Sequence, residues 1–112
     1  MSTNKKIIDA LNVFGYPIVP DLYNGKENRY FTFNYRDDRA KKFAEDEPLL
    51  TVNYMQIHLF MPISENHLKI KKEVRRSLLQ AGFTYPGVTV LTEPENNIKH
   101  IVFECEIEES EE

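Results

Sequence analysis

The stretch that decides the fold is "LLTVNYMQIHLFMPI", residues 49–63, in which apolar side chains alternate with polar or aromatic ones. A two-residue period sends successive side chains to opposite faces of a β-strand. We therefore expect a long strand over 50–61 with one face in the core and the other either wet or in contact with a partner. The expected core face is Met55, Ile57, Leu59 and Met61, and the other face is Tyr54, Gln56, His58 and Phe60.

Length and composition predict one domain with a modest core of its own. The chain has 112 residues, of which 41% are hydrophobic and 12% aromatic, and this content is typical of a globular protein. A formal net charge of −4 argues against a nucleic-acid binder, because such proteins usually carry a basic face. We place the domain at 1–108 and expect the acidic residues 109–112 to form a disordered tail.

The sequence carries no pattern typical of secretion or of a membrane span. No apolar run approaches the roughly 20 residues that cross a bilayer, and the first residues lack the apolar segment of a signal peptide. The single cysteine, Cys105, cannot form an internal disulfide, which fits a reducing compartment. We expect the protein to be cytosolic where it is made.

The first part of the chain predicts a helix followed by a hairpin. Ser2 or Thr3 can cap a helix over 3–14, whose apolar stripe is Ile7, Ile8, Leu11 and Phe14. Asn24–Gly25 is a strong signal for a type I′ turn, so we expect paired strands at 18–23 and 29–35, with Pro20 confining the first to a sheet edge or a bulge. In the second strand we expect Phe31, Phe33 and Tyr35 to face the core, opposite Tyr30, Thr32 and Asn34.

Residues 36–48 are densely charged and show no clean strand period, so we interpret them as a loop with a short helical turn that ends at Pro48. Beyond the long strand, Ser64 or Asn66 can cap a helix over 66–81 that stops at Gly82. Its buried stripe is Ile70, Val74, Leu78 and Ala81, and two strands at 87–92 and 98–108 follow. In the last strand Ile101, Phe103, Cys105 and Ile107 alternate with His100, Val102, Glu104 and Glu106.

These elements predict an α+β fold in the order α-β-β-β-α-β-β. We expect a mainly antiparallel sheet of four to five strands with both helices packed on one of its faces.

Five carboxylates of the charged segment are candidates for a metal site. Asp37, Asp38, Glu45, Asp46 and Glu47 could in principle hold Mg²⁺, but Arg36, Arg39, Lys41 and Lys42 lie among them and the spacing of known metal motifs is missing. The three histidines form no zinc-like pair, and Cys105 on an apolar strand face is read as a small buried hydrophobe. We therefore expect no catalytic residue, no metal and no cofactor.

Aromatic residues on the faces turned away from the core favour an interaction surface. Tyr30, Tyr54 and Phe60 stand beside polar neighbours on those faces, a mixture that is typical of protein interfaces. The alternative is that the helix 3–14 or the segment 36–48 covers this surface within the same chain.

The segments together resemble the small tail-completion proteins, also called tail terminators or tail-to-head joining proteins, of long-tailed phages and prophages. The resemblance lies in "GYPIVPDLYNGKENRYFTFNY", "RDDRAKKFAEDEPLLTVNYMQIHLFMP", the helix ending in "LLQAGF" and the terminal "HIVFECEIEE". It covers nearly the whole chain and is one of order and spacing, without a catalytic signature.

The resemblance implies a structural, non-enzymatic role in virion assembly. Such proteins form a ring, commonly a hexamer, that caps the tail tube and offers the head a docking surface. The implied partners are other copies of the chain, the tail-tube protein and a head-completion or connector protein, with DNA only passing through the ring. The implied location is the host cytoplasm during assembly and then the virion, at the junction of head and tail.

A ring needs contacts between two different patches of the subunit, and the mixed charges at 36–47 could form one of them. The residues expected at the interface are Tyr30, Asn34, Arg36, Asp37, Asp38, Arg39, Lys42, Phe43, Tyr54, His58 and Phe60. A small nucleic-acid-associated or regulatory protein that uses the basic helix 66–81 is the alternative.

Overall fold

The computed structural model of the chain describes the backbone of residues 2–44 and 47–110, and the side chains of residues 2–37 and 50–109. The elements in chain order are α1 (Thr3–Leu11), the 3₁₀ helix η1 (Asn12–Phe14), β1 (Ile18–Pro20), β2 (Tyr30–Ala44), β3 (Glu47–Pro62), α2 (Leu68–Gln80), β4 (Gly87–Glu93), the 3₁₀ helix η2 (Pro94–Asn96) and β5 (Ile98–Ser110).

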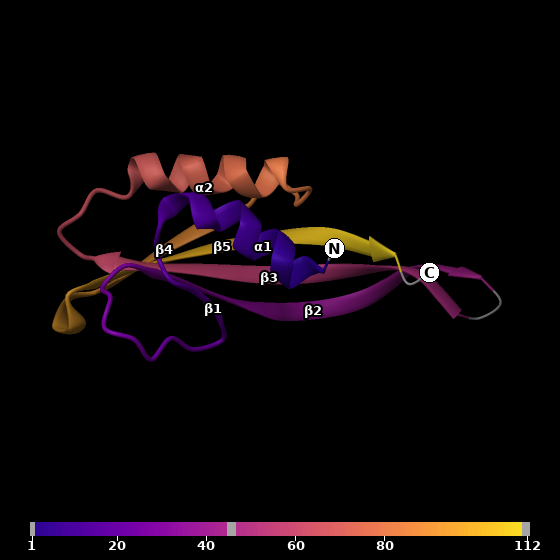
Figure 1. The fold of residues 1–112 in the computed structure, drawn as a ribbon, viewed down its shortest axis with the longest axis horizontal. Coiled ribbons are helices and arrows are strands. Elements are labelled where there is room, and N and C mark those ends of the chain that lie inside the picture. The colour runs from indigo at the N-terminus through magenta and orange to yellow at the C-terminus, as the bar shows by residue number, and fades with distance from the viewer. Residues whose placement is uncertain (1, 45–46, 111–112) are drawn as a thin grey trace.

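Five strands form one sheet in the order β1-β2-β3-β5-β4, with both α-helices on the same face (Figure 1). Strands β2, β3, β5 and β4 pair antiparallel, whereas β1 pairs parallel with β2. The predicted α+β class, its element order and the one-sided helix layer are confirmed.

Strand β3 lies in the middle of the sheet and has the alternation that its sequence predicts. Met55, Ile57 and Leu59 are at most 1% exposed. Ile57 stands between Phe33 of β2 and Phe103 of β5 in the register. Both helices pack on this face of the sheet. Ile7 and Leu11 of α1 and Val74 and Leu78 of α2 belong to the same buried core as the strand residues.

Helix α1 begins where expected, because the Ser2 hydroxyl accepts a hydrogen bond from the backbone N–H of Lys5 at 3.2 Å. Ile8 was expected in the core but is 38% exposed. The stripe follows Ile7 and Leu11, which are one helical turn apart, and Ile8 lies about 100° around the helix from Ile7.

Helix α2 begins at Leu68, two residues later than expected, after the Asn66 side chain accepts the N–H of Leu68 at 2.8 Å. Its end is as predicted. Gly82 adopts φ +104°, and the N–H groups of Gly82 and Phe83 bond back to the carbonyls of Leu79 and Leu78, each at 3.1 Å. This pair of bonds is a Schellman motif, which satisfies carbonyls that the helix end would leave open.

The hairpin expected at Asn24–Gly25 is wrong. Strand β1 runs parallel to β2, and both residues lie in the connecting loop 21–29, where Gly25 has no positive φ. The tight turn is instead at Asp21, whose φ is +62°. The N–H of Leu22 donates to the carbonyl of Pro20 at 2.8 Å, and this bond closes a three-residue turn centred on Asp21. Pro20 does stand in an edge strand, as predicted.

The loop and helical turn expected over 36–48 are also wrong, because β2 and β3 continue as paired strands through this segment. The register shifts between Tyr35 and Asp37, between Ala40 and Lys42, and again before Phe43. Each irregularity resets the alternation of faces, so the segment lacks the constant two-residue period by which a strand is recognised. Tyr35, expected in the core, lies at the first shift and is 48% exposed.

The molecule is elongated, with extents of 54 × 24 × 21 Å. β5 pairs with β3 only as far as Leu50, opposite Ser110, and in the described part of the chain residues 43–44 and 47–48 of the hairpin pair only with each other. Figure 1 shows this two-stranded end projecting beyond the helices, and we call it the arm. Because β5 reaches Ser110, residues 109–110 belong to the sheet and not to a disordered tail; 111–112 lie outside the described residues.

Replacing Gly82 with Ala should lower the free energy of unfolding by about 1 kcal/mol, because an L-residue is disfavoured at a positive φ. Urea denaturation measures the change. Gly87→Ala is the matched control, since Gly87 has no positive φ and a methyl group there meets nothing within 4 Å. Equal losses in the two variants would contradict the role given to the Gly82 conformation.

Candidate functional site

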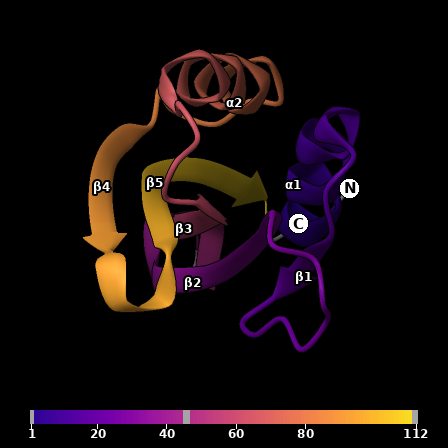
Figure 2. The same ribbon diagram turned by 90° about the vertical axis from the view of Figure 1, so that its left-hand side faces the viewer.

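The face of the sheet opposite the helices carries a row of stacked rings that crosses three strands. The register aligns Tyr30 of β2 with Phe60 of β3 and His100 of β5. Ring centroids are 4.8 Å apart for Tyr30 and Phe60 and 4.2 Å for Phe60 and His100. Tyr23, from the loop 21–29, stacks on the outer end of the row at 4.4 Å. We call this side of the sheet the open face; Figure 2 shows both helices on its opposite side.

The loop that contributes Tyr23 is fastened at two points. The Tyr23 hydroxyl accepts the N–H of Glu27 at 3.1 Å. Arg29 forms a two-pronged ion pair with Glu65 in the connection after β3, with Nε to Oε1 at 2.8 Å and Nη2 to Oε2 as the second contact. A bidentate arginine–carboxylate pair fixes orientation as well as distance. The loop therefore holds Tyr23 against the ring row.

Next to the rings, a chain of hydrogen bonds joins the polar side chains of the open face. His58 Nδ1 lies 2.8 Å from His100 Nε2, and His58 Nε2 lies 2.8 Å from Asn34 Oδ1. The Asn34 amide nitrogen donates to Gln56 Oε1 at 3.3 Å. Because the Asn34 oxygen only accepts, His58 carries its proton on Nε2, and His100 must then donate its Nε2 proton to His58 Nδ1.

Both imidazoles are half-buried and neutral at physiological pH. Burial lowers the pKa of His58, and the adjacent His100 lowers it further, against an opposing effect of Glu104. Burial also lowers the pKa of His100, with Glu93 acting in the opposite direction. Burial therefore opposes protonation of both members of the pair.

Toward the arm the open face becomes charged. Arg36 Nη1 lies 2.6 Å from Glu104 Oε2 across the sheet, and more than half of the Arg36 side chain is exposed. Tyr54 follows on β3, opposite Asp37 of β2 and Glu106 of β5. The face thus passes from stacked rings, through an amide–imidazole chain, to ion pairs.

The structure brings most of the expected interface residues onto one surface. Tyr30, Asn34, His58 and Phe60 form the ring row and its polar chain, and Arg36, Asp37 and Tyr54 continue it toward the arm. Asp38, Arg39, Lys42 and Phe43 lie on β2 opposite Asn53, Val52, Leu50 and Pro48, and their side chains are outside the described residues. Their role at an interface stays a prediction.

Three further members of this surface were not predicted, namely Tyr23, His100 and Glu104. The alternation over 98–108 does put His100 and Glu104 on the face away from the core. Only the pairing of β3 with β5, which a single sequence does not reveal, brings them beside His58 and Arg36.

Neither of the two coverings considered from the sequence protects the open face. Helix α1 lies on the opposite face (Figure 2), and the segment 36–48 continues the strands. Val102 is 8% exposed and Thr32 5%, because the neighbouring side chains of this face cover them. The face is therefore internally packed at its centre and open to solvent at its rim.

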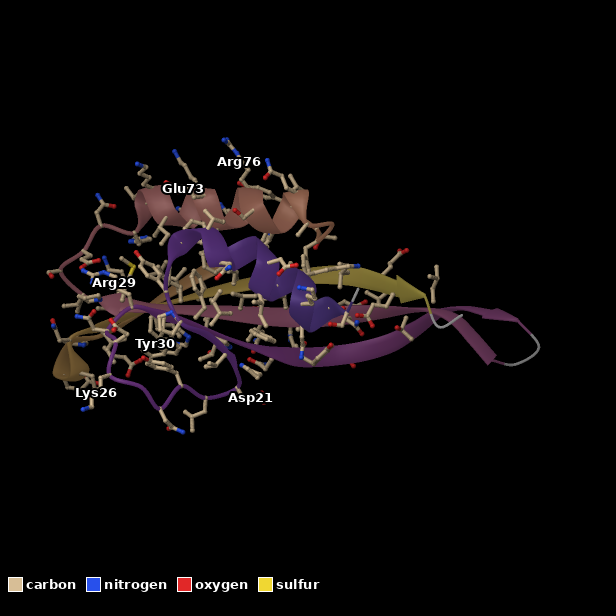
Figure 3. All side chains as sticks on the ribbon, viewed as in Figure 1. Asp21, Lys26, Arg29, Tyr30, Glu73 and Arg76 are labelled. Atoms are coloured by element: carbon tan, nitrogen blue, oxygen red, sulfur yellow. The ribbon has the colours of Figure 1, made fainter. Side chains whose placement is uncertain are left out.

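The basic residues of α2 lie on the outer side of the helix layer, where Figure 3 shows Arg76 pointing away from the sheet. The Lys69 side chain is 92% exposed and lies 4.0 Å from Glu73. Arg75 is engaged within the chain, because it covers the Tyr85 ring at 4.9 Å and donates to the Pro86 carbonyl at 3.0 Å. This arrangement gives a nucleic-acid surface little support beyond solvated lysines.

Cys105 is 5% exposed, and burial raises the pKa of its thiol to about 12, so it is not a poised nucleophile. Among residues whose side chains are described, no three His, Cys, Asp or Glu side chains form a group that could hold a metal ion. No helix in the described chain is long and apolar enough to cross a membrane.

No protein-family model matches the sequence, and no curated protein is significantly similar to it.

Stability should fall as the pH drops below about 6.5, because the unfolded chain then protonates histidines that the folded protein keeps neutral. Urea denaturation at about pH 7.5 and about pH 5.5 measures the slope. The double variant His58→Gln/His100→Gln should flatten it. His67→Gln is the control, since His67 lies outside the imidazole pair, and it should keep most of the slope. An unchanged slope in the double variant would exclude the pair as its source.

Proposed function

We propose that this protein is a structural, non-enzymatic subunit of the tail-completion kind, which caps the tube of a long phage tail as a ring and presents the head with a docking surface. The observation that carries the proposal is the arm, a two-stranded extension of β2 and β3 past the last residue of β5. The resemblance to tail-completion proteins in element order and spacing is the reason for proposing a ring on a phage tail as the assembly.

A two-stranded ribbon is only marginally stable in water. A third strand or a packed surface from a neighbouring molecule would stabilise the arm, so its projection from a 54 Å long molecule suits a contact between subunits. The contact would be heterologous, with the arm of one copy on the body of the next, and heterologous contacts form a ring when the rotation between neighbours closes.

Charge in the segment 36–47, which leads into the arm and forms part of it, suits the selection of a partner more than the strength of binding. The sequence over 36–47 carries both signs, and an exposed ion pair contributes only about 0–1 kcal/mol. Mixed charges would therefore fix the register between neighbouring copies. Exposed apolar groups, such as Leu22 at 71% and Tyr35 at 48% exposed, are suited to supply the larger share of the energy.

The remaining parts of the proposal follow from the role. The partners are other copies of the chain, commonly six in such rings, the tail-tube protein and a head-completion or connector protein. Assembly takes place in the host cytoplasm, and the finished ring stays in the virion between tail and head. DNA passes through the ring without being recognised.

Deletion of the gene in its native genome should leave heads and tails unjoined and tail tubes irregular in length, because no cap would then stop the addition of tube subunits. Electron microscopy of the released particles measures both effects. Complementation with the intact gene should restore joined particles of uniform length. Normal particles from the deletion strain would overturn the proposal.

The double charge reversal Arg39→Glu/Lys42→Glu, on the part of β2 that leads into the arm, should abolish joining while thermal unfolding stays close to that of the parent protein. Both residues lie on β2 beyond Phe31–Phe33, the residues that pair with β1. The matched control is Lys69→Glu/Lys72→Glu on the outer side of α2, which reverses the same number of charges away from the arm. Loss of joining in the control but not in the arm variant would move the contact to α2.

A further inference from the structure

Strand β4 forms the edge of the sheet and lacks the usual protection against pairing with another chain. It stands last in the strand order, and Figure 2 shows no described element beyond it. Natural edge strands are blunted by lysine, proline, a bulge or a covering segment. Residues 87–92, "GVTVLT", contain neither charge nor proline, and they pair with β5 without a register shift.

The register identifies which backbone groups of β4 point outward. The N–H of Ile63 bonds to the carbonyl of Asn97 at 3.1 Å, which marks 63 and 97 as directly bonded partners in the ladder of β3 and β5. Bonded pairs recur every second residue in an antiparallel ladder, so the odd-numbered residues of β5 bond to β3 and the even-numbered ones to β4.

It follows from the pairing of Leu91 with His100 that the odd-numbered residues of β4 bond to β5. The N–H and C=O groups of Val88, Val90 and Thr92 therefore point away from the sheet. The same alternation puts the odd-numbered residues of β2 on its outer side, and the bonds from Phe31 to Pro17 and from Asp21 to Phe33 agree with this.

We propose that β4 pairs antiparallel with β4 of a second copy of this chain, about a two-fold axis that passes beside Val90. In this register Val90 meets Val90 of the other copy, and Val88 meets Thr92 in both directions. Three bonded pairs would supply about six backbone hydrogen bonds. The two sheets become one, with both helix layers on the same side.

The side chains of β4 fit this register. Val90 is 39% and Leu91 48% exposed, and both lose apolar surface when the strands pair. Glu93, the only charged residue of the strand, comes opposite Gly87 of the other copy, so like charges do not face each other. A charged partner strand, in contrast, would find no side chain of opposite charge on residues 87–92.

This contact goes beyond the ring-forming role and does not depend on it. It is isologous, with the same surface used by both copies, and closes as a dimer, whereas the arm contact is heterologous. The two lie on different parts of the sheet, β4 at one edge and the arm at the end of β2 and β3.

The oligomeric state of the purified full chain tests the proposal. Sedimentation equilibrium from about 10 µM to about 1 mM should show a monomer–dimer equilibrium, as small interfaces bind weakly. Val90→Pro should weaken association about 30-fold or more, because it removes one donor from each copy and adds a ring at the axis. The fold should survive, since this N–H makes no bond to β5 and proline is tolerated where an edge strand faces solvent.

Val90→Thr is the matched control, because it keeps the N–H, the β-branched shape and the dimer. A wild-type monomer over the whole range, or an equally strong dimer in Val90→Pro, would overturn the proposal.

Cross-linking tests the two-fold register. Val90→Cys should form a disulfide-linked dimer quickly under mild oxidation, since bonded antiparallel partners have Cα atoms about 5.5 Å apart. Leu22→Cys is the control for random collision, because Leu22 is 71% exposed and lies outside the strand. The buried Cys105 stays in both variants. Linkage of Val90→Cys no faster than that of Leu22→Cys would exclude the two-fold axis and point instead to a contact between unlike surfaces.

Discussion

The whole sheet depends on the alternation of one strand, β3. Met55, Ile57 and Leu59 bury one face under both helices, and a slip of one residue would turn that face to solvent. Since β3 pairs with β2 on one side and β5 on the other, its register sets theirs. The neighbours of every residue on the open face are determined in the same way.

The open face is built differently from an ordinary solvated face. An antiparallel sheet with one covered side usually presents simple polar residues to water. Here Asn34, His58 and His100 satisfy one another in a continuous chain, beside a row of stacked rings. A hydrogen-bonded network of this kind rigidifies the surface that carries it. A partner that docks on this face would meet a preformed surface, ordered at its centre and charged toward the arm.

The sequence predicted those parts of the fold in which a local signal and the tertiary structure agree. The strand over 50–61, the helix with its stop at Gly82 and the last two strands are such cases. The sequence-based prediction was wrong where the tertiary structure overrode a local signal. Asn24–Gly25 is a strong turn signal, but Tyr23 stacks on Tyr30 and the chain returns parallel to β1. The residues 36–44 lost their strand pattern to repeated register shifts. The open face was predicted in part, because alternation gives the face of a residue but not its cross-strand neighbour.

Hydrogen bonds join the start of helix α1 to the end of strand β5. Glu109 of β5 accepts the backbone N–H of Thr3 at 3.0 Å as well as its hydroxyl, and that hydroxyl also accepts from Asn53 of β3 at 3.2 Å. β5 follows the other described strands in the sequence but lies between β3 and β4. Until β5 has been synthesised, the sheet lacks an inner strand and helix α1 lacks the Glu109 carboxylate at its first turn. The helices and strands that precede β5 therefore reach their final packing only when this strand joins them.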